Sequence, residues 1–173
     1  HSQASLLMST IRANFCIQCG QALTDFQEEE RVRRRCSAEC GYIYYGNPTP
    51  VVAAVVEQEG HILLVRSHGW PEKFFGLVTG FLEASETPEN GVLRELKEEL
   101  GLSGTIESLI GAYSFAARNE LIIAYHVRAQ GEVVLGPELA AYKRVPLDKL
   151  RPWPMGTGLA VQDFLTRRNS AAK

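Results

Sequence analysis

A run of glutamates in the middle of the chain is the group of residues best suited to chemistry. Between positions 83 and 99 there are six glutamates against one arginine and one lysine, a formal local charge of −4. The six are Glu83, Glu86, Glu89, Glu95, Glu98 and Glu99. On a helix, Glu95 precedes Glu98 and Glu99 by three and four residues, so all three project from one side. A solvated acidic face could tolerate this repulsion, whereas a hard divalent cation such as Mg²⁺ would turn it into binding energy.

Four cysteines form a second group, with the spacing of a metal site. Cys16 and Cys19 make one pair, Cys36 and Cys40 make another, and sixteen residues separate the pairs. Each pair can supply two sulfur ligands to one tetrahedral Zn²⁺, and the glycine after each pair allows a tight backbone turn. Two disulfides, which a reducing cytoplasm disfavours, or four unrelated thiols are the alternatives. We expect a zinc ribbon over residues 14–46, with structural zinc, because four thiolates leave no ligand position for water.

An arginine-rich run in the same segment could bind phosphate groups. Arg31–Arg35 contains four arginines in five positions. A charged strand on a small ribbon is usually only solvated. The whole chain has 18 Lys and Arg against 20 Asp and Glu, a formal charge of −2, which is not the basic footprint of a nucleic-acid-binding protein. We therefore do not expect a nucleic-acid partner, and a zinc-ribbon nucleic-acid binder is kept as an alternative.

The helices and strands that position these groups can be predicted from the periodicity of hydrophobic residues and from helix-capping residues. Thr87, Pro88 and Gly101 are typical of an N-cap, a first helical position and a C-terminal stop, so they predict a helix over residues 88–100. Strands are predicted over Val51–Glu57, Ile62–Ser67, Phe75–Val78, Thr105–Tyr113, Glu120–Ala129 and Val133–Leu135, with a strand-like segment at Lys143–Val145 and a closing helix over Gly158–Arg168. This order favours an α+β fold, with a mixed sheet covered by helices, over a parallel doubly wound sheet.

Length and composition allow one sizeable domain with a small appendage. The chain has 173 residues, 45% hydrophobic and 22% charged, which is typical of a globular protein. We expect a flexible N-terminus over 1–13, a proline-containing linker over 47–50, the main domain over 51–168 and a tail over 169–173. The longest apolar runs fall short of the roughly 20 residues that cross a bilayer. Because no secretory signal is recognisable, we expect a cytoplasmic location and no membrane partner.

The acidic segment resembles the Nudix box. The matching positions are Gly80, then after five residues Glu86, then after seven more Arg94-Glu95-Leu96-Lys97-Glu98-Glu99-Leu100-Gly101-Leu102. The match covers every defined position of the box over 23 residues. Ser85 departs from the glycine common before the first box glutamate, which concerns the geometry of the loop. The resemblance implies a mixed sheet sandwiched between helices, and hydrolysis of a nucleoside diphosphate linked to another moiety.

The resemblance also implies roles for the residues of the box. Glu95, Glu98 and Glu99 would be ligands of catalytic magnesium or manganese, and the backbone carbonyl of Gly80 is a frequent further ligand in that family. Arg94 and Glu86 would orient the metal-binding acids, since groups that surround a ligand set fix its geometry.

Residues outside the box are candidates for the base and for substrate contacts. Glu138 resembles the downstream glutamate of the family and is a candidate general base, with a solvated loop acid as the other interpretation. Phe75, Phe81 and Tyr113 could stack on a purine, although such rings more often simply belong to a core.

A zinc ribbon before a Nudix domain resembles two groups of enzymes, the NADH pyrophosphatases and hydrolases that act on ADP-ribose or FAD. NADH pyrophosphatases carry a Ser-Gln-Pro-Trp-Pro-Phe-Pro signature after the box, whereas residues 112–119 read Ala-Tyr-Ser-Phe-Ala-Ala-Arg-Asn. We therefore expect ADP-ribose or FAD as the nucleotide substrate. NADH hydrolysis and a non-catalytic nucleotide sensor are the alternatives, and a homodimer is implied by the resemblance alone.

Overall fold

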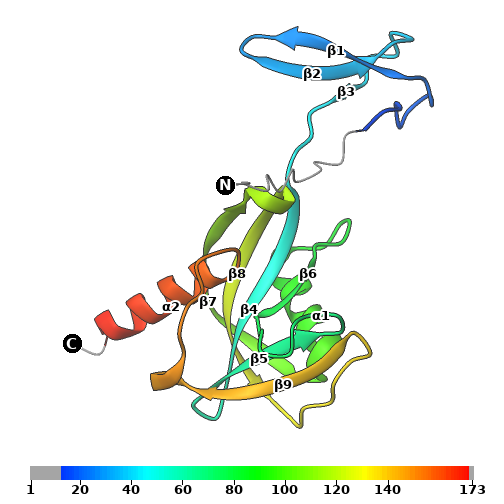
Figure 1. The fold of residues 1–173 in the computed structure, drawn as a ribbon. Helices are drawn as coiled ribbons and strands as arrows, with labels where there is room; N and C mark the ends of the chain where they lie inside the picture. Colours follow the sequence, from blue (N-terminus) through cyan, green and yellow to red (C-terminus); the bar gives the residue numbers. More distant parts are fainter. Residues whose placement is uncertain (1–12, 172–173) are drawn as a thin grey trace, which may run out of the picture. The chain divides into compact units, whose positions relative to one another are not determined.

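The computed structural model describes residues 13–171, which divide into two compact units (Figure 1). The first unit ends at Pro48 and also includes Ala117–Asn119, and the second contains the remainder of the chain from Thr49 onward. Residues 1–12 of the segment expected to be a flexible N-terminus lie outside the described residues.

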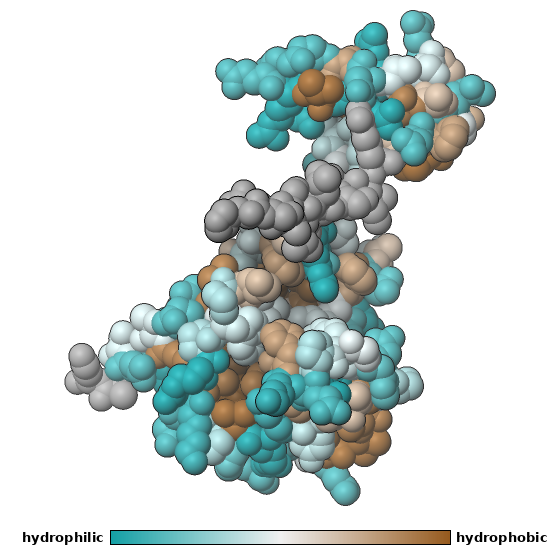
Figure 2. All heavy atoms as spheres, viewed as in Figure 1, coloured by the Kyte–Doolittle hydropathy of each residue, from teal (hydrophilic) through white to brown (hydrophobic). Residues whose placement is uncertain are grey.

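The first unit is a small antiparallel sheet with little core. Its strands run in the order β1 (Leu23–Glu28), β2 (Arg31–Cys36) and β3 (Ile43–Tyr44). Its buried residues are Cys16, Leu23 and Cys36. Figure 2 shows apolar residues among hydrophilic ones on its surface, and Phe15, Ile17 and Val32 are exposed. A unit of this size that buries so few apolar side chains needs another source of stability, such as a metal ion.

The second unit is built on a six-stranded mixed sheet. Its strands are β4 (Thr49–Gln58), β5 (His61–Ser67), β6 (Val78–Phe81), β7 (Ser103–Phe115), β8 (Glu120–Gln130) and β9 (Leu139–Pro146). The order is β7-β8-β4-β5-β9, and β6 pairs with β4. The pairing of β4 with β8 is parallel, while the other pairings are antiparallel. The mixed sheet predicted from the sequence is therefore confirmed.

The two faces of this sheet are covered by different helices. Because side chains alternate along a strand, Val52, Ala54 and Val56 of β4 face one way and Val51, Ala53 and Val55 face the other. The first set packs with α1 (Pro88–Leu100), through Val92, Leu96 and Leu100. The second set packs with α2 (Gly158–Ala171), through Ala160, Val161 and Phe164. The predicted α+β sandwich is confirmed.

Helix α1 begins and ends where its capping residues predict. The hydroxyl of Thr87 accepts a hydrogen bond from the backbone N–H of Asn90 at 3.2 Å, and Pro88 occupies the first helical position. Gly101 adopts φ 68° and its N–H donates to the carbonyl of Lys97, which closes the helix. These caps fix the start and end of the segment that carries the box glutamates.

Two of the predicted strands were wrong. In Phe75–Val78, Gly76 forms only an isolated bridge with Val65, and β6 begins at Val78. The chain changes partner there, from β5 to β4, which a short apolar run does not reveal. Val133–Leu135 is not a strand but part of the loop between β8 and β9, where hydrogen bonds to helix α1 replace strand pairing.

Other elements begin or end a few residues away from their predicted bounds. Strand β9 covers Leu139–Pro146, a longer segment than the expected Lys143–Val145. Helix α2 continues to Ala171, so the expected tail over 169–173 begins inside a helix. Strand β4 begins at Thr49, inside the expected linker over 47–50. Over residues 13–171, no helix is both long enough and apolar enough to cross a membrane.

The packing of α1 gives a first testable prediction. Leu96 is fully buried in the core between α1 and the sheet, so Leu96→Ala is expected to lower the free energy of unfolding by about 2–5 kcal/mol through lost burial and a cavity. Leu159→Ala on α2 is the matched control, because Leu159 is 42% exposed. Urea unfolding followed by tryptophan fluorescence measures both, and equal changes for the two variants would contradict this packing.

Candidate active site and metal centres

A close approach between strand β6 and helix α1 brings the acidic residues to the sheet. Gly80 of β6 pairs with Val52 of β4, and the carboxylate of Glu95 lies directly over it. A Cβ added at Gly80 would lie 1.9 Å from the Cδ atom of Glu95, far inside van der Waals contact. Only glycine therefore leaves room for the Glu95 carboxylate at the backbone of residue 80, where the box also has its glycine.

Arg94 holds three of the glutamates together. Its Nε and Nη2 donate to the two carboxylate oxygens of Glu86 at 2.9 and 3.0 Å, a bidentate pair. Its Nη1 donates to Oε1 of Glu95 at 2.6 Å and to Oε2 of Glu98 at 3.1 Å. Nη2 also donates to the carbonyl of Phe81 at 3.1 Å. The hydrogen bond from Arg94 lowers the pKa of Glu86 below its ordinary value, so Glu86 stays ionised.

The loop between β6 and α1 keeps its shape without the expected glycine. Ser85 adopts φ 65°, the left-handed region that glycine occupies most readily. Beyond it, Gly91 lies inside α1 where a Cβ would be 2.9 Å from both Oε2 of Glu86 and Cδ1 of Leu82. The loop therefore packs directly on the first turns of the helix, which places Glu86 against Arg94.

Among the acids of the cluster, Glu99 has the least favourable surroundings for a negative charge. Its Oε2 atom is buried and has no hydrogen-bond partner in the described part of the chain. Burial, together with the charges of Glu95, Glu138 and Glu98, raises the pKa of Glu99 to about 8. Burial likewise raises the pKa of Glu95, against the effect of Arg94. A buried oxygen without a partner, surrounded by other carboxylates, fits a site for a hard divalent cation.

Glu138 reaches this cluster because its loop is docked on the end of α1. The N–H of Val134 donates to the carbonyl of Leu100 at 2.9 Å, and the N–H of Gly136 donates to the carbonyl of Glu99 at 2.8 Å. A Cβ at Gly136 would lie 2.2 Å from the carbonyl oxygen of Glu98, so the loop packs tightly there. The exposed Glu138 is close enough for its charge to raise the pKa of Glu95 and Glu99.

The three aromatic candidates lie in different surroundings. Phe81 is 59% exposed, and its carbonyl accepts from Arg94 beside the acids. Phe75 and Tyr113 pack with the core between the sheet and α2, and the hydroxyl of Tyr113 donates to Asp163 at 2.6 Å. The structure therefore brings Phe81 next to the acidic cluster, and substrate contacts by Phe75 and Tyr113 stay predictions.

Three residues of this site were not recognised from the sequence. A backbone hydrogen bond from Thr79 reaches Glu99, and Gly91 and Gly136 provide the space for the two loops. Gly91 did carry a signal, because a glycine inside a predicted helix weakens it unless close packing requires one. Thr79 and Gly136 carried none, since their contacts depend on which segments meet in the fold.

The four cysteines of the first unit are brought together as predicted. All four sulfurs lie within 4.8 Å of one another, with Sγ–Sγ distances of 3.5 Å for Cys16–Cys40 and 3.3 Å for Cys19–Cys36. Backbone N–H groups of Gln21, Ala38 and Tyr42 donate to Cys19, Cys36 and Cys40. Such amides stabilise thiolates, the form that binds a metal. The soft four-sulfur donor set fits Zn²⁺.

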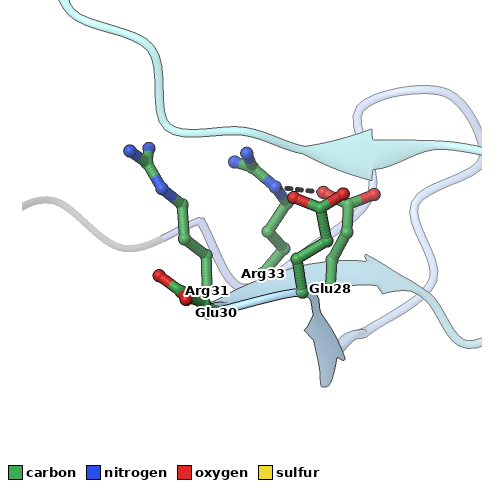
Figure 3. A pocket seen from close by; sticks show the side chains of 5 residues that line it. Glu28, Glu30, Arg31 and Arg33 are labelled. Carbon is green, nitrogen blue, oxygen red and sulfur yellow. Dashed lines mark hydrogen bonds and ion pairs between the residues drawn. The ribbon is translucent and has the colours of Figure 1, made fainter.

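The arginine run of the ribbon is partly neutralised. Figure 3 shows Arg31 and Arg33 extending from β2 beside Glu28 and Glu30, and Arg33 forms an ion pair with Glu28. With Glu29, three glutamates and two arginines line this pocket, which therefore offers no excess of positive charge to a phosphate. On the same strand, Arg34 pairs with Asp25 at 3.0 Å.

The clearance over Gly80 can be tested through metal binding. Gly80→Ala is expected to abolish the rise in Tm that Mn²⁺ gives the metal-free protein, because the new methyl group displaces the carboxylate of Glu95. For the unchanged protein this stabilisation is about 2.7 kcal/mol at a hundredfold excess of Mn²⁺ over its Kd. Gly76→Ala is the control, since its Cβ would meet Trp70 at an ordinary 3.4 Å. An undiminished rise in Gly80→Ala would count against the site.

The cysteine cluster can be tested separately from the second unit. Freshly purified protein is expected to carry about one equivalent of zinc, and Cys36→Ser to lose most of it, by metal analysis. Trp70 and Trp153, the two tryptophans of the chain, belong to the second unit, so thermal unfolding followed by tryptophan fluorescence should not change. Ser37→Ala is the control that keeps the zinc. Less than half an equivalent in the unchanged protein would contradict a zinc site.

Comparison with known proteins agrees with this geometry. The chain is 29% identical over 164 residues to the NAD-capped RNA hydrolase NudC of Pseudomonas aeruginosa, covering 92% of this chain and 58% of that protein. It is 40% identical over 79 residues to the ADP-ribose pyrophosphatase of Methanocaldococcus jannaschii, covering 45% of this chain and 47% of that protein. The matches thus span about half the length of each of these curated relatives.

Solved structures show the same fold. A NUDIX hydrolase from Nitrosomonas europaea superposes with a TM-score of 0.75 at 23% identity, covering 91% of this chain and 93% of that one. An ADP-ribose pyrophosphatase from Streptococcus suis has a TM-score of 0.58 at 24% identity, covering 72% and 92%. The family model described as NUDIX domain matches residues 47–162, well over half of the sequence. The chain therefore belongs to the NUDIX family.

Proposed function

We propose that this protein hydrolyses the pyrophosphate bond of a nucleoside diphosphate derivative, with ADP-ribose and FAD as the favoured substrates. The observation that carries this proposal is the buried, unpartnered oxygen of Glu99 inside a ring of carboxylates. Such an arrangement is costly in the absence of a cation. It lies on the box positions of a family whose members in the comparisons are named as pyrophosphatases and hydrolases.

Several residues of the chain would bind the metal ion together. Glu95, Glu98 and Glu99 would hold Mg²⁺ or Mn²⁺, with the carbonyl of Gly80 as a further oxygen. When bound, such an ion neutralises phosphate charge and makes a water molecule more acidic. Arg94 keeps the Glu95 and Glu98 carboxylates turned toward one another through its hydrogen bonds to both. Zinc at the cysteines is structural in this proposal.

The reaction needs a base and leaves two products. The oxygen of a water molecule forms a bond to one phosphorus, the bond between that phosphorus and the bridging oxygen breaks, and two monophosphates are released. A carboxylate must accept the proton that the water loses. Glu138 is our candidate, because it lies within the electrostatic reach of Glu95 and Glu99 and is exposed rather than committed to Arg94.

NAD derivatives form a second group of candidate substrates. Relatives named NAD-capped RNA hydrolase match 92% of this chain, although the NADH pyrophosphatase signature is missing from residues 112–119. ADP-ribose, FAD and NAD share an adenosine diphosphate half, so the same pyrophosphate chemistry applies to all three. An RNA that carries NAD at its end is the one nucleic-acid substrate that this comparison supports. The cytoplasmic location and the homodimer stay predictions.

A substrate panel tests the proposal. With Mg²⁺ or Mn²⁺ the protein is expected to convert ADP-ribose to AMP and ribose 5-phosphate, or FAD to AMP and FMN, with products identified by mass spectrometry. NADH and an NAD-capped oligonucleotide complete the panel. Glu98→Gln is expected to lower kcat by about two orders of magnitude or more, since it removes one charged oxygen from the metal site.

The control is another glutamate outside the cluster. Glu107 lies on β7 and pairs with Arg128, so Glu107→Gln should leave kcat unchanged. If no member of the panel is cleaved but one of them binds, the protein is a nucleotide sensor. If only a nucleic-acid probe binds, the ribbon-binder alternative replaces the enzyme.

A further inference from the structure

The segment that leads into strand β6 presents alternate residues to the two faces of the sheet. Phe75 and Leu77 pack in the core between the sheet and α2, whereas Val78 packs in the core between the sheet and α1. Because side chains alternate along an extended chain, Gly76 and Gly80 face the same way as Val78. These two glycines therefore lie on the α1 face, which carries the acidic cluster.

The ring of Trp70 lies over Gly76, just as the carboxylate of Glu95 lies over Gly80. A Cβ added at Gly76 would lie 3.4 Å from the Cζ3 atom of Trp70 and 3.9 Å from the Cε1 atom of Phe74. The two glycines are separated by about 13 Å, the length of four residues of extended chain. The ribose and the two phosphates of a nucleoside diphosphate can bridge such a distance.

A second set of contacts joins the loop that carries Trp70 to the acids. The N–H of His68 donates to the carbonyl of Glu138 at 3.1 Å. Glu138 in turn is close enough to Glu95 and Glu99 for its charge to raise the pKa of both. Trp70 follows His68 by two residues. The loop between β5 and β6 is therefore connected to the acidic cluster both along β6 and through the segment that carries Glu138.

Hydrogen bonds within this loop hold the two rings in place. The N–H of Trp70 donates to the carbonyl of Ser67 at 3.3 Å, and the N–H of Phe74 donates to the carbonyl of Pro71 at 3.0 Å. The ring centroids lie 5.2 Å apart, and Phe74 is 42% exposed. Neither ring is among the described residues that form the two cores of the second unit. Fixed aromatic rings that keep part of their surface in solvent are suited to stacking with a nucleobase.

We propose that Trp70 and Phe74 bind the adenine base of the substrate whose pyrophosphate lies at the acidic cluster. This inference rests on the proposed function for the identity of the ligand. Adenine is the base that ADP-ribose, FAD and NAD have in common. The proposal assigns recognition of the base to the loop between β5 and β6, and the chemistry to α1. A ligand without an aromatic base would lose this contact and keep those of its phosphates.

Trp70 can report the binding of the base directly. The chain has two tryptophans, so Trp153→Phe leaves Trp70 as the only one. In this variant, with Mg²⁺ present, AMP is expected to quench the tryptophan fluorescence with a saturable dependence. Ribose 5-phosphate, which carries a phosphate but no base, should not quench it. Fluorescence that AMP leaves unchanged, or that both compounds quench equally, overturns the inference. This measurement follows binding alone and requires no hydrolysis.

Kinetics give an independent measure of the same contact. Phe74→Ala and Trp70→Leu are each expected to raise the KM for ADP-ribose about tenfold with kcat little changed, because stacking is lost while the metal site is kept. Leu109→Ala is the matched control, since Leu109 is 53% exposed and lies on β7, the opposite edge strand of the sheet. An unchanged KM in Phe74→Ala, or equal rises in Phe74→Ala and Leu109→Ala, overturns the inference. Phe74 is exposed, so this variant decides the question even if Trp70→Leu does not fold.

The two proposals fail in different ways. Quenching of Trp70 by AMP, in a protein that cleaves no member of the panel, supports the base site and contradicts the proposed hydrolysis. Cleavage of ADP-ribose with an unchanged KM in Phe74→Ala supports the hydrolysis and contradicts the base site. Agreement of the two requires both the quenching by AMP and the raised KM.

Discussion

Repulsion between carboxylates is the constraint on which the acidic site depends. Arg94 donates hydrogen bonds to three glutamates of α1 and its preceding loop, and to one backbone carbonyl. A planar group with five donors can do this, whereas a lysine ammonium could not hold the same geometry. Glu99 is left outside this arrangement, and burial beside the other carboxylates raises its pKa, so its ionised form needs a positive charge that Arg94 does not supply.

Space, more than backbone conformation, explains the glycines around this site. Gly80, Gly91 and Gly136 each lie where a Cβ would collide with a carboxylate, a leucine or a helix carbonyl. None of the three adopts a positive φ. Ser85, in contrast, adopts a positive φ without being glycine, at a cost of about 1 kcal/mol or more that the surrounding contacts must offset. The loop between β6 and α1 is thus held in place by its packing on helix α1.

Local signals predicted the parts of the molecule that depend on local chemistry. The caps of α1, the spacing of its glutamates and the paired cysteines involve residues close in sequence, and the structure has them as expected. The segments 75–78 and 133–135 were misread because their partners are remote, one on a different strand and the other at the end of a helix. The approach of Arg66 and Lys143 to the ring of Phe75 was equally hidden, because only the register of β5 and β9 brings these two residues to one face of the sheet.

The parallel pair at the centre of the sheet also determines when the second unit can form. Thr49 of β4 pairs with Glu120 of β8, which lies 71 positions later in the chain. Closing so long a loop is entropically unfavourable and slows folding. During synthesis the centre of the sheet cannot form until β8 has left the ribosome, while the hairpins that carry the cysteines have only local contacts and can form earlier. The ribbon is therefore expected to be the first part of the chain to mature, well before the catalytic half acquires its core.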